Sequence, residues 1–334
     1  MSEQQLIYDN HNRPISYLRL AVTDRCNLRC FYCMPEHGIQ YLPKKELLTY
    51  EEMIRLVQVL VNLGVSKVRI TGGEPFVRKN LIDFLTNLAE VEGLNQINIT
   101  TNGVLTKPFI PRLKEIGISS VNLSIDTLDR DRFFKITRRD ELPQVMESFH
   151  AFIEQGIPLK LNAVVMDGKN TEDILPMVEL TKQYPVSVRF IEEMPFNGEG
   201  AHYAKLIWDH KKIIETIREA YPALSKIDDP KHSTSYNYSI PGHLGNIGVI
   251  AAFSRTFCGS CNRIRLTAQG TLKTCLYDDG VMNFRDLLRS GADDEKVEQE
   301  FIRLFGQRAK DGFEAEKRRS QSSPVQESMS TIGG

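Results

Sequence analysis

The 334-residue sequence has no long apolar run, no surplus of either charge and only six cysteines. No apolar stretch approaches the about 20 residues that a membrane-spanning helix needs, and the polar start Met1–Gln5 is not that of a signal peptide. We therefore expect a cytoplasmic protein without membrane insertion, in a compartment where disulfides rarely persist. Because 42 Lys and Arg residues balance 43 Asp and Glu residues, the net charge gives no reason to expect nucleic acid as a partner.

The cysteines form two groups of three, and none is left over. The first triad has the spacing C-x3-C-x2-C and consists of Cys26, Cys30 and Cys33. The second triad has the spacing C-x2-C-x13-C and consists of Cys258, Cys261 and Cys275. Zinc is one interpretation, with His37 completing the first site and a histidine such as His243 the second. The other is a [4Fe–4S] cluster in each triad, with one iron left open to bind a small molecule.

Six short runs rich in β-branched residues alternate with longer segments of helical periodicity. The expected strands are residues 16–23, 65–71, 96–100, 120–126, 159–165 and 186–194. This alternation predicts an α/β fold with a parallel sheet of right-handed βα units. Six units are two fewer than a full (β/α)8 barrel has, so we expect a partial (β/α)6 barrel of the TIM type. Its chemistry should lie at the C-terminal ends of the strands.

A change of composition near residues 225–235 indicates a boundary. We expect the barrel over residues 1–225 and a C-terminal extension over residues 226–315, which carries the second cysteine triad and a hairpin at 263–277. The remaining residues, 316–334, are polar and lack periodicity, which predicts a flexible tail ending in Gly-Gly.

Basic residues interrupt four of the six expected strands. They are Arg19, Lys67, Arg69, Lys160 and Arg189. Strands of a parallel barrel are normally buried and apolar, and a buried charge is costly unless it is paired. Arg263 and Arg265 follow the second triad at i and i+2, so they point to the same face of a strand. The group indicates a polyanion such as a triphosphate; local ion pairs with Glu192 or Glu193 are the alternative.

Two motifs resemble those of the radical S-adenosylmethionine superfamily. They are "CNLRCFYC" (26–33) and the glycine-rich "TGGEP" (71–75) one βα unit later. Further segments resemble one family within it, that of molybdenum cofactor biosynthesis protein A, whose members are GTP 3′,8-cyclases. These segments are "TTNG" (100–103), "NLSIDTL" (122–128), "RFIEEMP" (189–195), "FCGSCNRIRLT" (257–267) and the terminal Gly-Gly, and the resemblance runs from about Arg13 to Gly334.

The resemblance implies that both triads hold [4Fe–4S] clusters and that the enzyme uses S-adenosylmethionine. It places Tyr32, Gly73, Ser124 and Met194 at S-adenosylmethionine. It implies a cyclisation in which C3′ of GTP joins C8 of the guanine, with Thr100 contacting GTP and the second cluster's open iron on the guanine. It also places Gly333 and Gly334 in the active site.

The partners that the resemblance implies are GTP, an electron donor of the flavodoxin or ferredoxin type, and the cyclic pyranopterin monophosphate synthase that receives the product. A homodimer is a further expectation. Two other classes of protein stay open. One is a radical enzyme that modifies a peptide and holds an auxiliary cluster, and the other is a zinc-stabilised binding module.

Overall fold

The computed structural model describes residues 6–194, 206–319 and 328–333. Its strands form one sheet in the order β12-β11-β10-β1-β2-β3-β4-β5-β6-β9-β8-β7. The six strands expected from the sequence are all present and lie side by side in chain order. They are β1 (Tyr17–Ala21), β2 (Lys67–Thr71), β3 (Gln96–Thr101), β4 (Ser120–Ser124), β5 (Leu159–Val165) and β6 (Ser187–Glu192). All five pairings between them are parallel.

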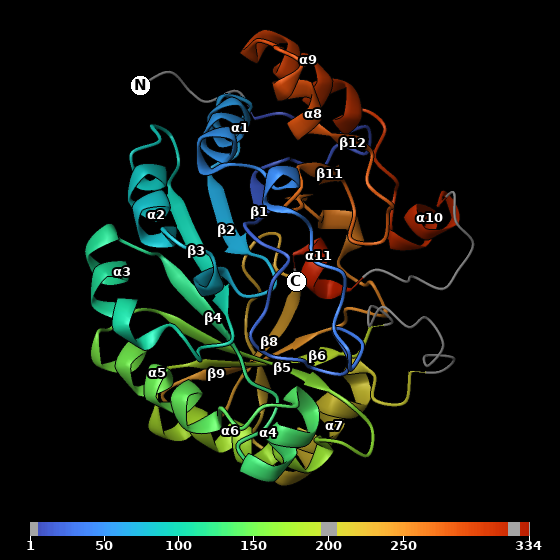
Figure 1. Ribbon diagram of the computed structural model, residues 1–334. Coiled ribbons are helices and arrows are strands. Elements are labelled where there is room, and N and C mark those ends of the chain that lie inside the picture. Colours follow the sequence, from blue (N-terminus) through green and yellow to red (C-terminus); the bar gives the residue numbers. More distant parts are fainter. Residues whose placement is uncertain (1–5, 195–205, 320–327, 334) are drawn as a thin grey trace.

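Helices cover the outer, convex face of the sheet, and the sheet does not close (Figure 1). They are α1 (Tyr50–Asn62), α2 (Leu81–Ala89), α3 (Ile110–Ile116), α4 (Arg130–Thr137), α5 (Leu142–Glu154), α6 (Ile174–Gln183) and α7 (His210–Ala220). The α/β class is confirmed, and the open sheet agrees with a partial barrel. In the described part of the chain, no helix combines the length and the apolar character required to cross a membrane.

The start of α1 illustrates how local sequence fixes these helices. The Thr49 side chain accepts from the Glu52 amide, and the Glu52 carboxylate accepts from the Thr49 amide, which satisfies two donors that a helix start leaves free. Leu56 and Leu60 lie one turn apart on the same face and are fully buried against the sheet. The expected capping pair is therefore present.

Two further parallel strands extend the barrel wall at both edges. β9 (Asn246–Ile250) pairs with β6, and β10 (Arg263–Leu266) pairs with β1. The sheet therefore runs without interruption across the expected boundary at residues 225–226. Antiparallel strands flank both additions: β8 (Ser235–Ser239) and β7 (Ser225–Lys226) beyond β9, and β11 (Thr271–Lys273) and β12 (Met282–Asn283) beyond β10. The β10–β11 pairing is the expected hairpin.

The C-terminal segment returns to the inside of the barrel. After α8 (Phe284–Arg289), α9 (Asp294–Phe305) and α10 (Gly312–Lys317), the short helix α11 (Met329–Ile332) lies within the curve of the sheet (Figure 1). Ile332 is 1% exposed and packs with Tyr277 and Ala315. This end of the 316–334 segment differs from the expected flexible tail because an apolar side chain anchors it, and the Ser328 side chain caps it.

Candidate active site

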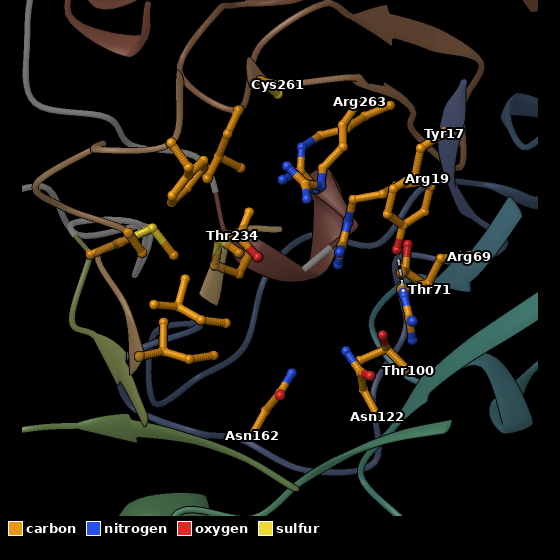
Figure 2. A pocket seen from close by; sticks show the side chains of 18 of the residues that line it. Tyr17, Arg19, Arg69, Thr71, Thr100, Asn122, Asn162, Thr234, Cys261 and Arg263 are labelled. Atoms are coloured by element: carbon orange, nitrogen blue, oxygen red, sulfur yellow. Dashed lines mark hydrogen bonds between the residues drawn. The ribbon is translucent and has the colours of Figure 1, made fainter. Parts of the chain in front are cut away.

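One cavity of about 580 Å³ lies inside the barrel, and it brings the two cysteine triads together. It is lined by all six cysteines, by the predicted S-adenosylmethionine contacts Tyr32, Gly73, Ser124 and Met194, and by the predicted GTP contacts Arg19, Lys67, Arg69, Thr100, Lys160, Arg189, Arg263 and Arg265. Figure 2 shows several of these side chains pointing toward the same open space. Residues separated by more than 200 positions in the chain thus form one site.

The first triad lies in the loop that follows β1. All three cysteines are free thiols, and burial raises the pKa of Cys26 to about 12 and that of Cys33 to about 11. The Tyr32 hydroxyl, between two of the cysteines in sequence, donates to the buried carboxylate of Asp126 over 2.8 Å. The protein environment therefore favours neutral thiols, and a bound metal would have to displace their protons.

The glycine-rich segment after β2 is hydrogen-bonded to the backbone of this loop. The Gly73 amide donates to the Thr23 carbonyl over 2.8 Å, and the Glu74 amide donates to the Arg25 carbonyl over 2.8 Å. A Cβ atom at Gly73 would lie 2.2 Å from the Arg25 carbonyl oxygen. Gly73 lines the cavity. The position requires glycine because the two backbones approach too closely to leave room for a side chain.

Glu74 is a buried acid that the sequence argument left without a role. Its carboxylate accepts from the Asn102 amide over 2.7 Å and from the Thr101 hydroxyl over 2.8 Å. Burial raises the pKa of Glu74 to about 7 despite these hydrogen bonds. The Asn102 side chain in turn lies with its amide nitrogen 3.7 Å from the Cys26 sulfur. Glu74 thus holds the end of β3 against the first triad.

The second triad is held by a buried ionic network. The Arg308 guanidinium donates to the carbonyl of Cys261 over 3.4 Å and to that of Thr274, the residue before Cys275, over 3.0 Å. Its Nη2 also lies 3.9 Å from the Cys261 sulfur. Burial alone would raise the pKa of the Cys261 thiol, but the guanidinium groups of Arg263 and Arg308 hold it below its ordinary value. The two guanidinium groups therefore favour the thiolate form of Cys261 more than burial alone would allow.

The two triads lie beyond opposite ends of the same strands. β10 runs parallel to β1, so the second triad's Cys261 precedes the start of β10 while the first triad's Cys26 follows the end of β1. β1 has 5 residues, which corresponds to about 17 Å. A ligand as long as an extended nucleoside triphosphate can therefore reach from one triad toward the other.

Between the triads lie two rows of inward-facing side chains, here called the cationic rows. One row is Arg263, Tyr17 and Lys67, and the next is Arg265, Arg19 and Arg69, each read across β10, β1 and β2. Lys160 on β5 and Arg189 on β6 continue the basic lining. The sequence predicted all seven of these cations at a polyanion site, and the structure brings them to one cavity.

The seven cations of this lining have no acidic partner among the residues that the structure describes. The alternative of a pair with Glu192 is wrong, because its buried carboxylate accepts from His210 and Ser254 instead. Burial and then the charge of Arg189 lower the pKa of Lys160 to about 8, and burial and then Arg69 lower that of Arg189 to about 10.

Several buried polar atoms in the cavity wall also lack partners within the described structure. They are Arg19 Nε, Thr71 Oγ1, Thr100 Oγ1, Asn122 Oδ1, Asn162 Oδ1 and Arg189 Nε. An unsatisfied buried polar atom is costly, so a cluster of them facing one cavity indicates a polar ligand. Asn122 and Asn162 were missed by the sequence argument. The sequence feature that could have identified them is a side-chain amide in the middle of a strand that is expected to be apolar.

The C-terminal residues 328–333 contact residues that line the same cavity. The Arg265 guanidinium donates to the Gly333 carbonyl over 3.3 Å, and the Ser328 hydroxyl donates to the Cys33 carbonyl over 2.6 Å. Gly333 adopts a φ of 84°, which favours glycine. The terminal segment therefore contacts both a cationic row and the first triad. Gly334 lies outside the described residues.

The geometry argues against the zinc interpretation as it was drawn. Among residues 6–194, 206–319 and 328–333, no three His, Cys, Asp or Glu side chains converge on a point that a single metal ion could occupy. Neither His37 nor His243 lines the cavity, and His243 instead lies 2.8 Å from the Thr181 hydroxyl. In a [4Fe–4S] cluster each cysteine binds a different iron, so its ligands need not converge on one ion. Two triads of free, partly buried cysteines suit such a cluster better.

Comparisons with known proteins agree with these features. The Radical SAM superfamily model matches residues 20–181, and the Molybdenum Cofactor Synthesis C model matches residues 186–313. A protein of Thermodesulfovibrio yellowstonii named GTP 3′,8-cyclase is 39% identical over 328 residues, which cover 98% of this chain and 99% of that protein. The protein of the same name from Syntrophomonas wolfei is 40% identical over 88% of this chain and 90% of its own length.

The chain belongs to the GTP 3′,8-cyclase family. Membership confirms the family that the motifs indicated. Molybdenum cofactor biosynthesis protein 1 of Bos taurus is 44% identical over 299 residues, covering 89% of this chain but 46% of that protein. The chain thus spans about half the length of this animal relative. A crystal structure of Streptococcus suis SuiB bound to S-adenosylmethionine has a TM-score of 0.58 at 19% identity, over 85% of this chain and 67% of that one, which shows a shared fold.

Proposed function

We propose that this chain converts GTP to (8S)-3′,8-cyclo-7,8-dihydroguanosine 5′-triphosphate, the first step of molybdenum cofactor biosynthesis. The observation that carries the proposal is that one cavity holds, between two cysteine triads, seven cations that form no ion pair with any described residue. A triphosphate supplies the negative charge that these cations lack, and a nucleoside is long enough to extend from them toward a triad. Relatives that match nearly the whole chain are named for this activity.

The first triad is proposed to hold a [4Fe–4S] cluster through Cys26, Cys30 and Cys33. When bound there, the reduced cluster supplies the electron that cleaves S-adenosylmethionine to methionine and a 5′-deoxyadenosyl radical. Around it, Ser124 at the end of β4 and Met194 beyond β6 line the wall on which S-adenosylmethionine would lie.

The second triad is proposed to hold a [4Fe–4S] cluster through Cys258, Cys261 and Cys275, close to the guanine. The triphosphate is assigned to the cationic rows, with Lys160 and Arg189 completing its surroundings. Thr100 and Asn122 are neighbours across β3 and β4 and offer unpartnered oxygens to the ribose. Fixing both ends of GTP would hold C3′ in place, and such orientation can supply much of a rate enhancement.

Several partners follow from this activity and are proposed with it. They are a one-electron donor of the flavodoxin or ferredoxin type, and a cyclic pyranopterin monophosphate synthase that consumes the product. A cytoplasmic location and a homodimer belong to the same proposal. The protein would act on a free nucleotide and would need neither nucleic acid nor a membrane.

Anaerobic incubation of the reconstituted protein tests the proposal. The protein is mixed with S-adenosylmethionine, dithionite and GTP, ATP, CTP or UTP in turn, and 5′-deoxyadenosine and cyclised nucleotide are measured. We expect GTP alone to yield both products in equal amounts. Arg189→Gln should reduce GTP turnover, whereas Arg130→Gln, which removes an exposed arginine outside the cavity, should not. Equal turnover of all four nucleotides, or 5′-deoxyadenosine without cyclised GTP, would refute the assignment.

A further inference from the structure

Tyr17 stands at the centre of the first cationic row. Across the parallel register it has Arg263 on one side and Lys67 on the other, and the next row consists of cations throughout. The two rows therefore hold five basic side chains and a single tyrosine. Of the six, only the tyrosine can become negatively charged.

The contacts of Tyr17 extend to three of these five basic side chains. Arg69 Nε donates to the Tyr17 hydroxyl oxygen over 2.6 Å, as the dashed line in Figure 2 shows. The Lys67 ammonium lies 5.0 Å and the Arg263 guanidinium 5.6 Å from the centre of the Tyr17 ring. A second nitrogen of Arg69, Nη1, donates to the Ile99 carbonyl over 2.9 Å, so two hydrogen bonds fix the orientation of Arg69.

The surroundings of Tyr17 favour its ionised form. Arg69 and Lys67 face it from β2, Arg19 from its own strand β1, and Arg263 and Arg265 from β10. Lys160 on β5 and Arg189 on β6 add further positive charge across the cavity, and both sense the charge of Tyr17. Although burial opposes ionisation, the charges of Arg69 and Arg19 lower the pKa of Tyr17 to about 7. The unpaired cations thus have one available counter-charge within their own rows.

We propose that Tyr17 is a positioning residue that acts as the built-in counter-group of the cationic rows. Its phenol oxygen orients Arg69 and carries negative charge while the cavity holds no polyanion. When a triphosphate binds, its own negative charge replaces that of the phenolate, and Tyr17 takes up one proton from solvent. The inference rests on the proposed function only for the choice of GTP as the natural triphosphate.

A titration of the protein labelled with ¹³C at the tyrosine Cζ atoms tests the inference. The Tyr17 resonance is the one missing in Tyr17→Phe, and we expect it to move to the phenolate position with a midpoint near neutral pH. At about pH 8, inorganic triphosphate should return it to the phenol position. Calorimetry at the same pH should show proton uptake on triphosphate binding that is reduced by as much as about one proton in Tyr17→Phe.

Tyr50→Phe is the matched control. Its hydroxyl also takes part in a hydrogen bond, which it donates to the Lys79 carbonyl, and an arginine, Arg78, lies over its ring at 4.0 Å, but Tyr50 does not line the cavity. Its loss should leave proton uptake unchanged. Should Tyr17→Phe not fold, Arg69→Gln gives the same information, because removal of that guanidinium should shift the Tyr17 titration to higher pH.

Each result separates this inference from the proposed function. A Tyr17 phenol that stays protonated up to about pH 9 in the free protein, or proton uptake equal in Tyr17→Phe, overturns the counter-group while GTP cyclisation is untouched. Protonation of Tyr17 by inorganic triphosphate in a protein that does not cyclise GTP supports the counter-group and refutes the cyclase.

Discussion

Arg308 donates to the buried carboxylate of Asp9 over 3.0 Å, joining two residues that are 299 positions apart. The same carboxylate oxygen accepts from Arg13 over 2.7 Å, and Arg13 donates to the Cys258 carbonyl over 3.2 Å. Through Arg308 and Arg13, one carboxylate is therefore connected to the backbone at Cys258, Cys261 and Thr274, the residue before Cys275. This network therefore helps to hold the backbone of the second triad in place.

Asp9→Asn should therefore destabilise the protein and loosen the second triad. The change leaves two buried guanidinium groups without their counter-charge, which typically costs about 3–5 kcal/mol of unfolding free energy. Chemical denaturation measures this loss, and iron content after reconstitution measures the effect on the triad. Asp140→Asn is the control, because Asp140 also binds an arginine side chain but at the exposed surface. Equal losses in the two variants would mean that burial of the network does not matter.

The barrel itself could be predicted because periodicity reports local burial. The six strands each carry β-branched runs between amphipathic helices, and the order of such βα units along the chain is also their order in the sheet. The β10–β11 hairpin could also be predicted, but the parallel pairing of β9 with β6 and of β10 with β1 could not. These pairings join segments that are far apart in the chain, and no local pattern encodes them.

Residues of the site could be predicted where a charged side chain occurs in a strand that is expected to be buried and apolar. Arg19 and Arg189 could be found because charge in a parallel strand needs a reason. Tyr17 could not, since tyrosine is common in strands, and its meaning depends on neighbours from β2 and β10. The Asp9–Arg308 contact was equally hidden, because it joins the two ends of the chain.

Replacing one cysteine of each triad should separate two roles. Two remaining thiolates hold a [4Fe–4S] cluster poorly, so each single variant should lose up to about four irons per chain. Cys26→Ala should abolish S-adenosylmethionine cleavage, whereas Cys275→Ala should retain the first cluster but form no cyclised GTP. Iron analysis and electron paramagnetic resonance of the reduced proteins distinguish the clusters. Normal cyclisation by Cys275→Ala would remove the second triad from the substrate site.

Lys160→Met should increase the stability of the folded protein and weaken GTP binding. The folded protein lowers the pKa of Lys160 from 10.5 to about 8, so the charged form is disfavoured by folding. This cost is fully present below about pH 8 and disappears as pH rises toward 10.5. At pH 7 the variant should gain roughly 1–3 kcal/mol of unfolding free energy but bind GTP about 10- to 150-fold more weakly.

Denaturation curves and GTP titrations at several pH values check the Lys160 prediction. The wild type should gain stability relative to Lys160→Met between about pH 8 and pH 10. Lys182→Met is a suitable control, because Lys182 is a lysine on the outer helix α6 and does not line the cavity. A Lys160→Met variant that is less stable at pH 7 would show that the lysine has a favourable partner in the folded protein.

Gly333→Ala should uncouple radical formation from cyclisation. The residue has a φ of 84°, and an added Cβ atom would lie 2.8 Å from Thr71 Oγ1 and 2.9 Å from the Ala21 Cβ atom. Both neighbours belong to strand ends between the cationic rows and the first triad, so the terminal segment cannot keep its position beside Arg265. Both clusters and GTP binding should be nearly unchanged, but a misplaced substrate loses the benefit of orientation.

The measurement for Gly333 is the amount of cyclised GTP formed per 5′-deoxyadenosine released. We expect this ratio to be near one in the wild type and to fall at least about tenfold in Gly333→Ala. Gly117→Ala is a matched control, since Gly117 has a φ of 83° with nothing within 4 Å of an added Cβ atom. It bears the same backbone strain, about 1–2 kcal/mol, without crowding the cavity. If both variants kept the wild-type ratio, the terminal glycine would have no part in the reaction, and its contact with Arg265 would serve only to anchor the chain end.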